Sequence, residues 1–288
     1  AIISLENTPA GGEHPAHIHL NSAAEGGGIA FTFNPINGDN GMSKTNVASL
    51  NDGTSFKYDD IVAYDGYINV HLSAEALSTI VAQGDIGQNE LTETSKSYDL
   101  GSVAVPDISG SVTFTERVNG EALAIISLEN TPAGGEHPAH IHLNSAAEGG
   151  GIAFTFNPIN GDNGMSKTNV ASLNDGTSFM YDDIVAYDGY INVHLSAEAL
   201  STIVAQGDIG QNELTEMSTS YDLSSVAVPG ISGSVTFTER ANGEALAIIS
   251  LENTPAGGEH PAHIHLNSAA EGGGIAFTFN PINGDNGM

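Results

Sequence analysis

The feature that most constrains this chain is an internal repeat of 123 residues. The segment AIISLEN begins at Ala1, Ala124 and Ala247. The chain of 288 residues therefore holds two full periods and a third that stops at Met288. Because each repeat of this length is expected to form its own structural unit, the fold should be a string of similar domains of about 120 residues each.

The few differences between repeats suggest where one domain ends and the next begins. Residues 1–123 and 124–246 differ at six positions: Lys57/Met180, Thr94/Met217, Lys96/Thr219, Gly101/Ser224, Asp107/Gly230 and Val118/Ala241. Four of the six lie between residues 94 and 107, in a stretch rich in Ser, Thr and Gly that is typical of a connection between domains. We therefore expect a partial repeat at 1–100 that lacks its first strand and a complete domain at 101–223. A second partial repeat at 224–288 would be completed by a following segment or a neighbouring chain, as in a section of a longer array.

Alternation of apolar and polar residues is the main secondary-structure signal inside each repeat. SVTFTER (111–117) and IAFTFN (29–34) each place their apolar residues on one face, as strands do. Turn-forming segments such as NPINGDNG, NDG and VNG separate the strands. Only residues 55–64 and 73–81 have a pattern that could form a helical turn. The sequence predicts an all-β fold of tandem Greek-key antiparallel β-sandwich or barrel domains.

The stretch EHPAHIHLN holds three histidines, and all three repeats contain it. Ile18 and Leu20 are expected on the core face of a strand, so His17 and His19 project from its opposite face, about 6–7 Å apart at their bases. The alternation in YINVHL likewise puts His71 on an outward face. If the two strands are neighbours, three imidazoles converge, and three nitrogen ligands with an open position suit copper or zinc.

The same positions in the three repeats give the candidate metal ligands: His17, His19, His71, His140, His142, His194, His263 and His265. A further histidine in the turn before each pair is expected to support the ligands and not to bind metal itself: His14, His137 and His260. A second interpretation stays open, in which the histidines form a hydrogen-bonded polar cluster inherited from a metal-binding ancestor.

HPAHIHLN resembles the HGFHVHE stretch of Cu/Zn superoxide dismutases, whose last two histidines bind copper, and YINVH resembles a later histidine-bearing strand of that family. The chain is even more similar to the chordin-type (CHRD) domain of bacterial secreted proteins. The AHIH strand of that domain is matched at Ala16–His19, its YxNVH strand at Tyr67–His71 and its G-x-I segment at Gly84–Ile86. The resemblance covers roughly residues 109–215, and it implies a related Greek-key β-sandwich and an extracellular or cell-surface location, most often bacterial.

The departures from the dismutase pattern argue against enzymatic activity. The chain has no bridging histidine, no zinc cluster and no cysteine, and its only arginines, Arg117 and Arg240, are not at the position that guides superoxide. The formal net charge of -29 repels an anionic substrate, and it equally disfavours nucleic acids and anionic membrane surfaces. We therefore expect no superoxide dismutase activity.

Acidic turns offer a second kind of candidate metal site. Oxygen ligands from several aspartates suit calcium, although the spacing is not that of an EF-hand. Asp or Asn followed by Gly is also a common turn signal, so simple turns are the alternative. The candidate calcium ligands are Asp59, Asp60, Asp65, Asp182, Asp183 and Asp188.

Tandem near-identical domains add reach, rigidity or valency without new chemistry. We expect a structural subunit of an extracellular filament, surface array or adhesin, whose partners are identical repeats of the same or neighbouring chains. The segment SVAVP is expected to add a strand to the adjacent domain and stiffen the joint, although its proline limits such pairing. The expected joint residues are Val103, Val105, Pro106, Val226, Val228 and Pro229. The alternative is an extracellular or periplasmic copper-binding module with weak redox activity.

Overall fold

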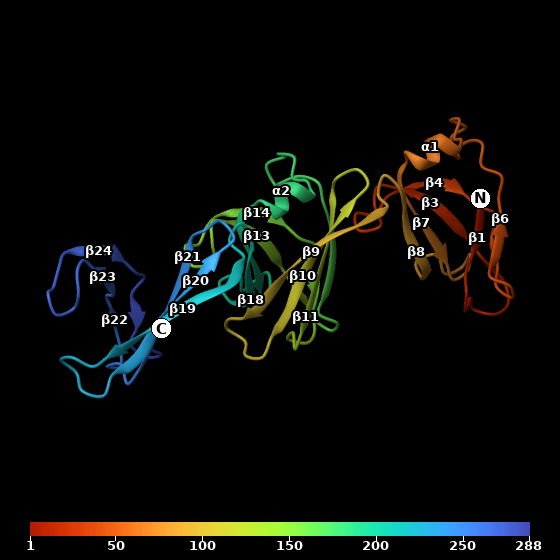
Figure 1. Ribbon diagram of the computed structural model, residues 1–288. Coiled ribbons are helices and arrows are strands. Elements are labelled where there is room, and N and C mark those ends of the chain that lie inside the picture. Colours follow the sequence, from red (N-terminus) through yellow and green to blue (C-terminus); the bar gives the residue numbers. More distant parts are fainter. The chain divides into compact units, whose positions relative to one another are not determined.

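The computed structural model describes all residues, Ala1–Met288, and nearly all of its regular elements are strands (Figure 1). The expected all-β class is confirmed. The chain divides into two compact units, Ala1–Gly210 and Gln211–Met288, and the first unit contains two repeats. No helix in the chain has the length and apolar character of a transmembrane segment.

The first repeat forms two antiparallel sheets of four strands. One sheet has the order β1 (Ile2–Ser4), β6 (Met42–Lys44), β5 (Ile36–Asn37), β2 (Glu13–His14). The other has the order β4 (Ile29–Thr32), β3 (Ala16–Leu20), β7 (Asp65–His71), β8 (Ile80–Gly87). Both sheets contribute to one apolar core: Ala16, Ile18, Phe31, Phe33, Ile36, Phe56 and Val70.

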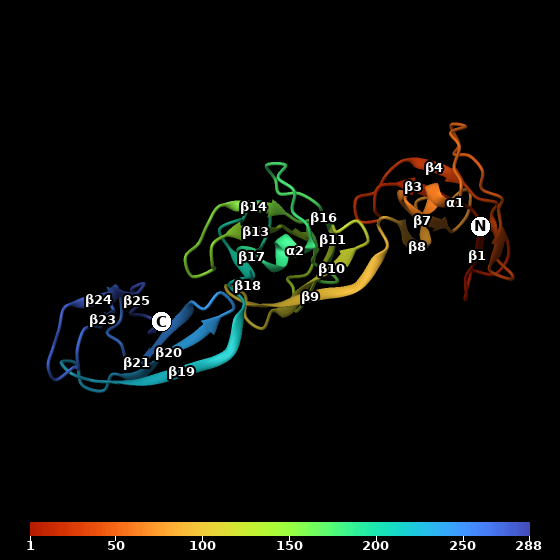
Figure 2. The same cartoon turned by 45° about the horizontal axis from the view of Figure 1, so that its top comes forward.

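In the second repeat, ten strands form one continuous antiparallel sheet. The order is β12 (Glu136–His137), β15 (Ile159–Asn160), β16 (Met165–Val170), β11 (Ala122–Glu129), β10 (Ser109–Arg117), β9 (Leu91–Ser102), β18 (Ile203–Gly210), β17 (Asp188–His194), β13 (Ala139–Leu143), β14 (Ile152–Thr155). Figure 2 shows several of these strands, including β9, β10 and β18. Val112 and Phe114 of β10 are fully buried in the core, which confirms the face assigned to them by alternation.

β9 joins the two halves of this sheet, and it begins earlier than expected. It pairs with β10 over most of its length, and its last residues, Gly101 and Ser102, pair with β18. The expected domain boundary at residue 100 therefore falls inside a strand of the second repeat. The first strand of the second repeat starts at Leu91, and only the short connection 88–90 separates it from β8 of the first repeat.

The SVAVP segment follows β9, and in the second repeat it contacts its own domain. The Val103 and Ala104 amides donate to the backbone oxygens of Val204 and Ile203, at 3.3 and 2.9 Å. Val105 packs against the core of the same repeat. The segment thus extends the β9–β18 pairing and does not reach the preceding domain, so it is not the joint that the sequence suggested.

Each of the first two repeats has one short helix, α1 (Tyr58–Val62) and α2 (Tyr181–Val185). The Asp60 carboxylate accepts a hydrogen bond from the Lys57 amide at the start of α1, as acidic residues in a first turn often do. Helix was expected within 55–64, where α1 forms, and also within 73–81, where it does not. Residues 73–79 instead form two turns that lead into β8.

The second unit contains the beginning of a third repeat. Its three-stranded sheet has the order β19 (Leu214–Ser224), β20 (Ser232–Arg240), β21 (Ala245–Glu252). Two strand pairs follow: β22 (Glu259–His260) with β25 (Ile282–Asn283), and β23 (His263–His265) with β24 (Ile275–Thr278). The second SVAVP copy is exposed, with Val226 99% accessible.

Candidate metal site

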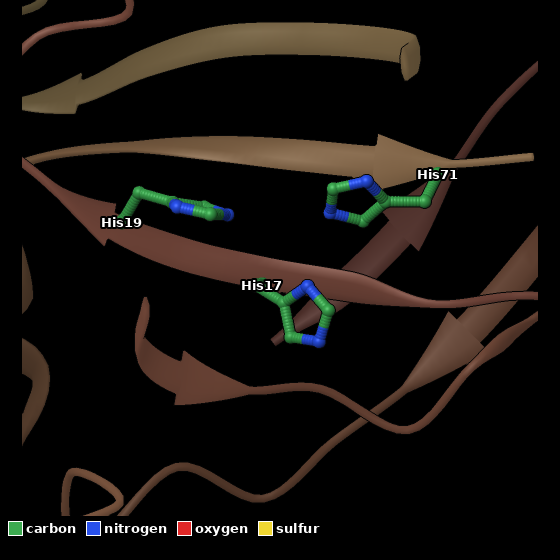
Figure 3. A group of neighbouring side chains, drawn as sticks. All are labelled: His17, His19 and His71. Carbon is green, nitrogen blue, oxygen red and sulfur yellow. The ribbon is translucent and has the colours of Figure 1, made fainter. Parts of the chain in front are cut away.

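Three histidines converge in the first repeat, because β3 and β7 are adjacent antiparallel strands. His17 and His19 lie two residues apart on β3, and His71 ends β7 (Figure 3). One ring nitrogen from each lies within 4.8 Å of the others. Zinc–nitrogen bonds of about 2.0–2.1 Å in tetrahedral geometry place two ligand nitrogens about 3.4 Å apart, so the rings would move closer together to bind an ion.

The hydrogen bonds of two of these rings determine which nitrogen faces the centre. His19 Nδ1 lies 2.9 Å from the Gly27 carbonyl oxygen, and His71 Nδ1 lies 2.6 Å from the Leu77 carbonyl oxygen. A carbonyl oxygen only accepts, so each Nδ1 carries the proton and each Nε2 carries a lone pair. A backbone carbonyl in this role is the usual support for a metal-binding histidine.

The nitrogens that face one another have no hydrogen-bond partner in the protein. They are Nδ1 of His17 and Nε2 of His19 and His71, all buried. A buried polar atom without a partner is costly, and native proteins contain few of them. The three do not bond to one another, so the hydrogen-bonded polar cluster considered above leaves its central atoms unsatisfied, whereas a metal ion would satisfy all three.

The loop after β3 is built to cover the site. Ser22 donates from its amide and its hydroxyl to the Glu25 carboxylate, which closes the loop on itself. A Cβ at Gly27 would lie 2.0 Å from the Leu20 carbonyl oxygen, so only glycine lets the loop fold back and present its own carbonyl to His19. The Tyr67 ring stacks on His19, with centroids 5.0 Å apart, and its hydroxyl accepts from the Gly27 amide.

These covering segments correct one expectation about the histidines. Alternation placed them on an outward face, yet they are only 5–8% exposed. The loop after β3 covers one side of the site, and the 73–79 turns supply Leu77 at another. Leu20, which was expected in the core, is 46% exposed. Sequence reasoning missed Gly27, Tyr67 and Leu77, and the EGGG run that contains Gly27 was the available signal.

Burial and repulsion from neighbouring rings favour the neutral form of His17 and of its counterpart His140. Desolvation, followed by the nearby His71 and His19, lowers the pKa of His17. In the second repeat, desolvation and then His194 and His142 lower the pKa of His140 to about 4. Neutral imidazole is the form that binds metal, so at neutral pH these rings need not lose a proton to do so.

The second repeat reproduces the site atom for atom. His140 Nδ1, His142 Nε2 and His194 Nε2 are buried and without partners, and they lie within the same 4.8 Å. His142 Nδ1 lies 2.9 Å from the Gly150 oxygen, and His194 Nδ1 lies 2.6 Å from the Leu200 oxygen.

The third repeat contains two of the three histidines of this arrangement. His263 and His265 lie on β23, and His265 Nδ1 lies 3.0 Å from the Gly273 oxygen. The chain ends before any counterpart of His71. This pair is therefore two-thirds of a ligand set.

The remaining sequence candidates lie outside the triads. His14 is 2% exposed, with its ring nitrogens 2.8 Å from the Leu72 oxygen and 3.0 Å from the Pro9 oxygen, so it ties an entry loop to the residue after His71. His137 makes the equivalent contacts with Leu195 and Pro132, and His260 keeps the one with Pro255.

The candidate calcium ligands do not assemble. The only groups of three or more potential ligands that converge are the two histidine triads. Asp60 bonds to the helix start and Asp65 accepts from the Asn89 side chain, so these carboxylates serve separate local structures. Asp59 and Asp60, like Asp182 and Asp183, lie in the first turn of a short helix, and Asp65 and Asp188 begin strands, so the structure places them neither in a calcium site nor in simple turns.

Comparison with known protein families, with curated proteins and with solved structures gave no match to this chain.

Proposed function

We propose that the chain is an array of CHRD-like β-sandwich repeats, each of which binds one transition-metal ion through three histidines. The observation that carries this proposal is the set of buried, unpartnered imidazole nitrogens, which recurs in two repeats. His17, His19 and His71 would hold the ion in the first repeat, and His140, His142 and His194 in the second.

Copper is the preferred ion, with zinc next. Among divalent first-row ions copper binds nitrogen ligands most tightly, and imidazole suits both metals. His17 and His19 also lie in the stretch that resembles the copper-binding stretch of Cu/Zn superoxide dismutases. Bound copper would supply a one-electron redox centre, whereas zinc has no redox chemistry.

We do not extend the proposal to superoxide dismutase activity. Arg117 is buried and bonded to Asp85, so it does not guide an anion toward the histidines. The net charge of -29 also opposes superoxide approach.

Metal stoichiometry tests the proposed function. The full chain should bind two copper ions, His17→Ala should bind one, and the double variant His17→Ala/His140→Ala none, since removing one of three ligands collapses affinity. Metal analysis after dialysis, with the copper(II) absorption spectrum, measures the result. His263→Ala is the matched control, because its pair lacks a third ligand, and it should still bind two. Binding that is absent in the parent chain or unchanged in the double variant would contradict the site.

A second candidate function is a structural subunit of an extracellular filament or surface array, with identical repeats of the same or neighbouring chains as partners. The near-identity of the repeats and the three-residue connection between β8 and β9 favour it. Exchange of strands between neighbouring chains would provide the contact. Electron microscopy of the purified protein should show fibres with a regular domain spacing, and particles that stay single at high concentration would count against this function.

A further inference from the structure

Arg117 is one of only two arginines in the chain, and it is almost completely buried. It ends β10 of the second repeat, but its Nη1 donates to the Asp85 carboxylate of β8 in the first repeat, at 2.8 Å. Nη1 also donates to the Asn89 carbonyl in the connection between the repeats. Its Nε donates to Asn169 of its own repeat, at 2.7 Å. One guanidinium therefore bonds to both repeats and to the segment that joins them.

The connection 88–90 is anchored to the first repeat. The Asn89 side chain donates to the Asp65 carboxylate at 2.8 Å, and Asn89 is only 1% exposed. The Gln88 side chain donates to the Ala63 oxygen at 2.6 Å, and its amide donates to the Tyr64 oxygen at 2.9 Å.

The same connection is also held by the second repeat. The turn after β10 donates two backbone hydrogen bonds to it, from Val118 to Glu90 at 2.9 Å and from Asn119 to Gln88 at 3.2 Å. A further bond between the repeats joins the Asn157 side chain to the Ala24 oxygen, at 3.2 Å. Every residue of the connection thus has a bonded neighbour in the second repeat.

The contacts with the connection recur in the second unit. At the start of the second unit, Arg240 Nη1 donates to the Asn212 oxygen, and the amides of Ala241 and Asn242 donate to Glu213 and Gln211. Asn212 is also 1% exposed. In both places the arginine bonds the middle residue of the three-residue connection, and backbone amides of the following turn bond the other two.

We propose that Arg117 docks the second repeat onto the first in a single fixed orientation, with β8 and the 88–90 connection as the docking surface. Burial of an arginine costs desolvation energy, and a buried ion pair is more convincing as a device that sets register than as a source of stability. The guanidinium suits this position because its planar fork bonds several acceptors at once, whereas lysine offers a point charge. Arg117 is a positioning residue here, and the inference does not depend on the metal site.

Spin-label distance measurements on the full chain test this docking. The chain has no cysteine, so Thr54→Cys and Thr177→Cys, both exposed, place one label in each of the two repeats. The parent should give a narrow distance distribution. Arg117→Met should lose it and give a broad one. Asp85→Asn removes the charge from the other side of the ion pair, and it should also broaden the distribution. This variant provides the test if Arg117→Met does not fold.

The matched control is Lys57→Met, which removes one positive charge elsewhere and introduces the residue that the second repeat already has at this position. It should keep the narrow distribution. Circular dichroism should show the same strand content in all variants, because the change concerns orientation and not folding. A broad distribution in the parent, or a narrow one in both Arg117→Met and Asp85→Asn, would overturn the proposal.

Discussion

At the scale of single residues, the histidine triad buries ring nitrogens that lack partners while its hydrogen bonds hold the rings in place. Three ring nitrogens are buried and face the same small space without partners. The outer nitrogens of His19 and His71 are fixed by carbonyl oxygens, so these rings cannot turn to satisfy the inner ones without losing a bond. The protein therefore holds unfavourable polar atoms in place, which is characteristic of preorganised ligand sites.

Acidification is expected to destabilise the metal-free protein through these residues. The pKa of His140 is about 4, and the pKa values of His17 and His194 are also lowered. The pKa of a histidine in the unfolded chain is about 6.5. As pH falls through this window the unfolded chain takes up protons that the folded chain does not, so the free energy of unfolding falls.

Urea denaturation of the metal-free chain at about pH 7 and about pH 5 measures this effect. The double variant His17→Gln/His140→Gln is the control, because it removes one titrating ring from each triad while keeping polar side chains. It should lose a smaller part of its stability on acidification than the parent chain. An equal loss in both proteins would assign the pH dependence to other groups.

The convergence of the triad could be predicted from the sequence, but its burial could not. Alternation indicated which residues share a face, and convergence followed on the condition that the two strands are neighbours, which the structure meets. Alternation did not tell whether that face is covered. The cover comes from the loop after β3 and the 73–79 turns, whose conformations depend on Gly27 and on contacts between distant segments.

At the scale of elements, β9 explains why the domain boundary was misplaced. Only the inward residues near its end, Tyr98 and Leu100, are buried, while Thr94 faces solvent. A strand with so little buried surface has a polar composition and tolerates substitution, and both properties are also typical of a linker. Of the clustered differences, Thr94 and Gly101 are exposed, Lys96 is half-buried and Asp107 lies beyond the end of β9, so they mark a weakly buried strand and the turn after it.

A glycine in β18 provides a test of the β9 contact. A Cβ at Gly207 would lie 2.1 Å from the Asp99 oxygen of β9, whereas at the same repeat position Gly84 has nothing within 4 Å. Gly207→Ala should therefore force β9 and β18 apart and destabilise the second repeat by about 1–3 kcal/mol, as overpacking does.

Gly84→Ala is the matched control, since the surrounding sequence is the same, and it should leave stability nearly unchanged. Chemical denaturation followed by circular dichroism gives both values. If the two variants are equally stable, β9 does not pack on β18 as described.

At the scale of the whole molecule, charge is the dominant property. Acidic residues number 35 against 6 lysines and arginines, so most carboxylates have no cationic partner to balance them. Self-repulsion of this kind keeps a protein soluble but opposes its compact state.

Raising the ionic strength should therefore stabilise the protein. The Tm is expected to rise between about 10 mM and about 150 mM sodium chloride, because the Debye length shortens from about 30 Å to about 8 Å. Differential scanning calorimetry measures the shift. Choline chloride at equal ionic strength should give the same rise, since screening does not depend on the identity of the ion. A rise that only one cation produces would indicate a specific site instead.

The separation of the triad histidines along the chain has a consequence for the order in which a site is assembled. His263, His265 and the carbonyl that orients the latter are already in place without a third ring. In a complete repeat that ring arrives more than fifty residues later, since His19 and His71 are separated by that length of chain. If the triads bind metal as proposed, a repeat synthesised from its N-terminus would become able to hold the ion only after its second half has been made.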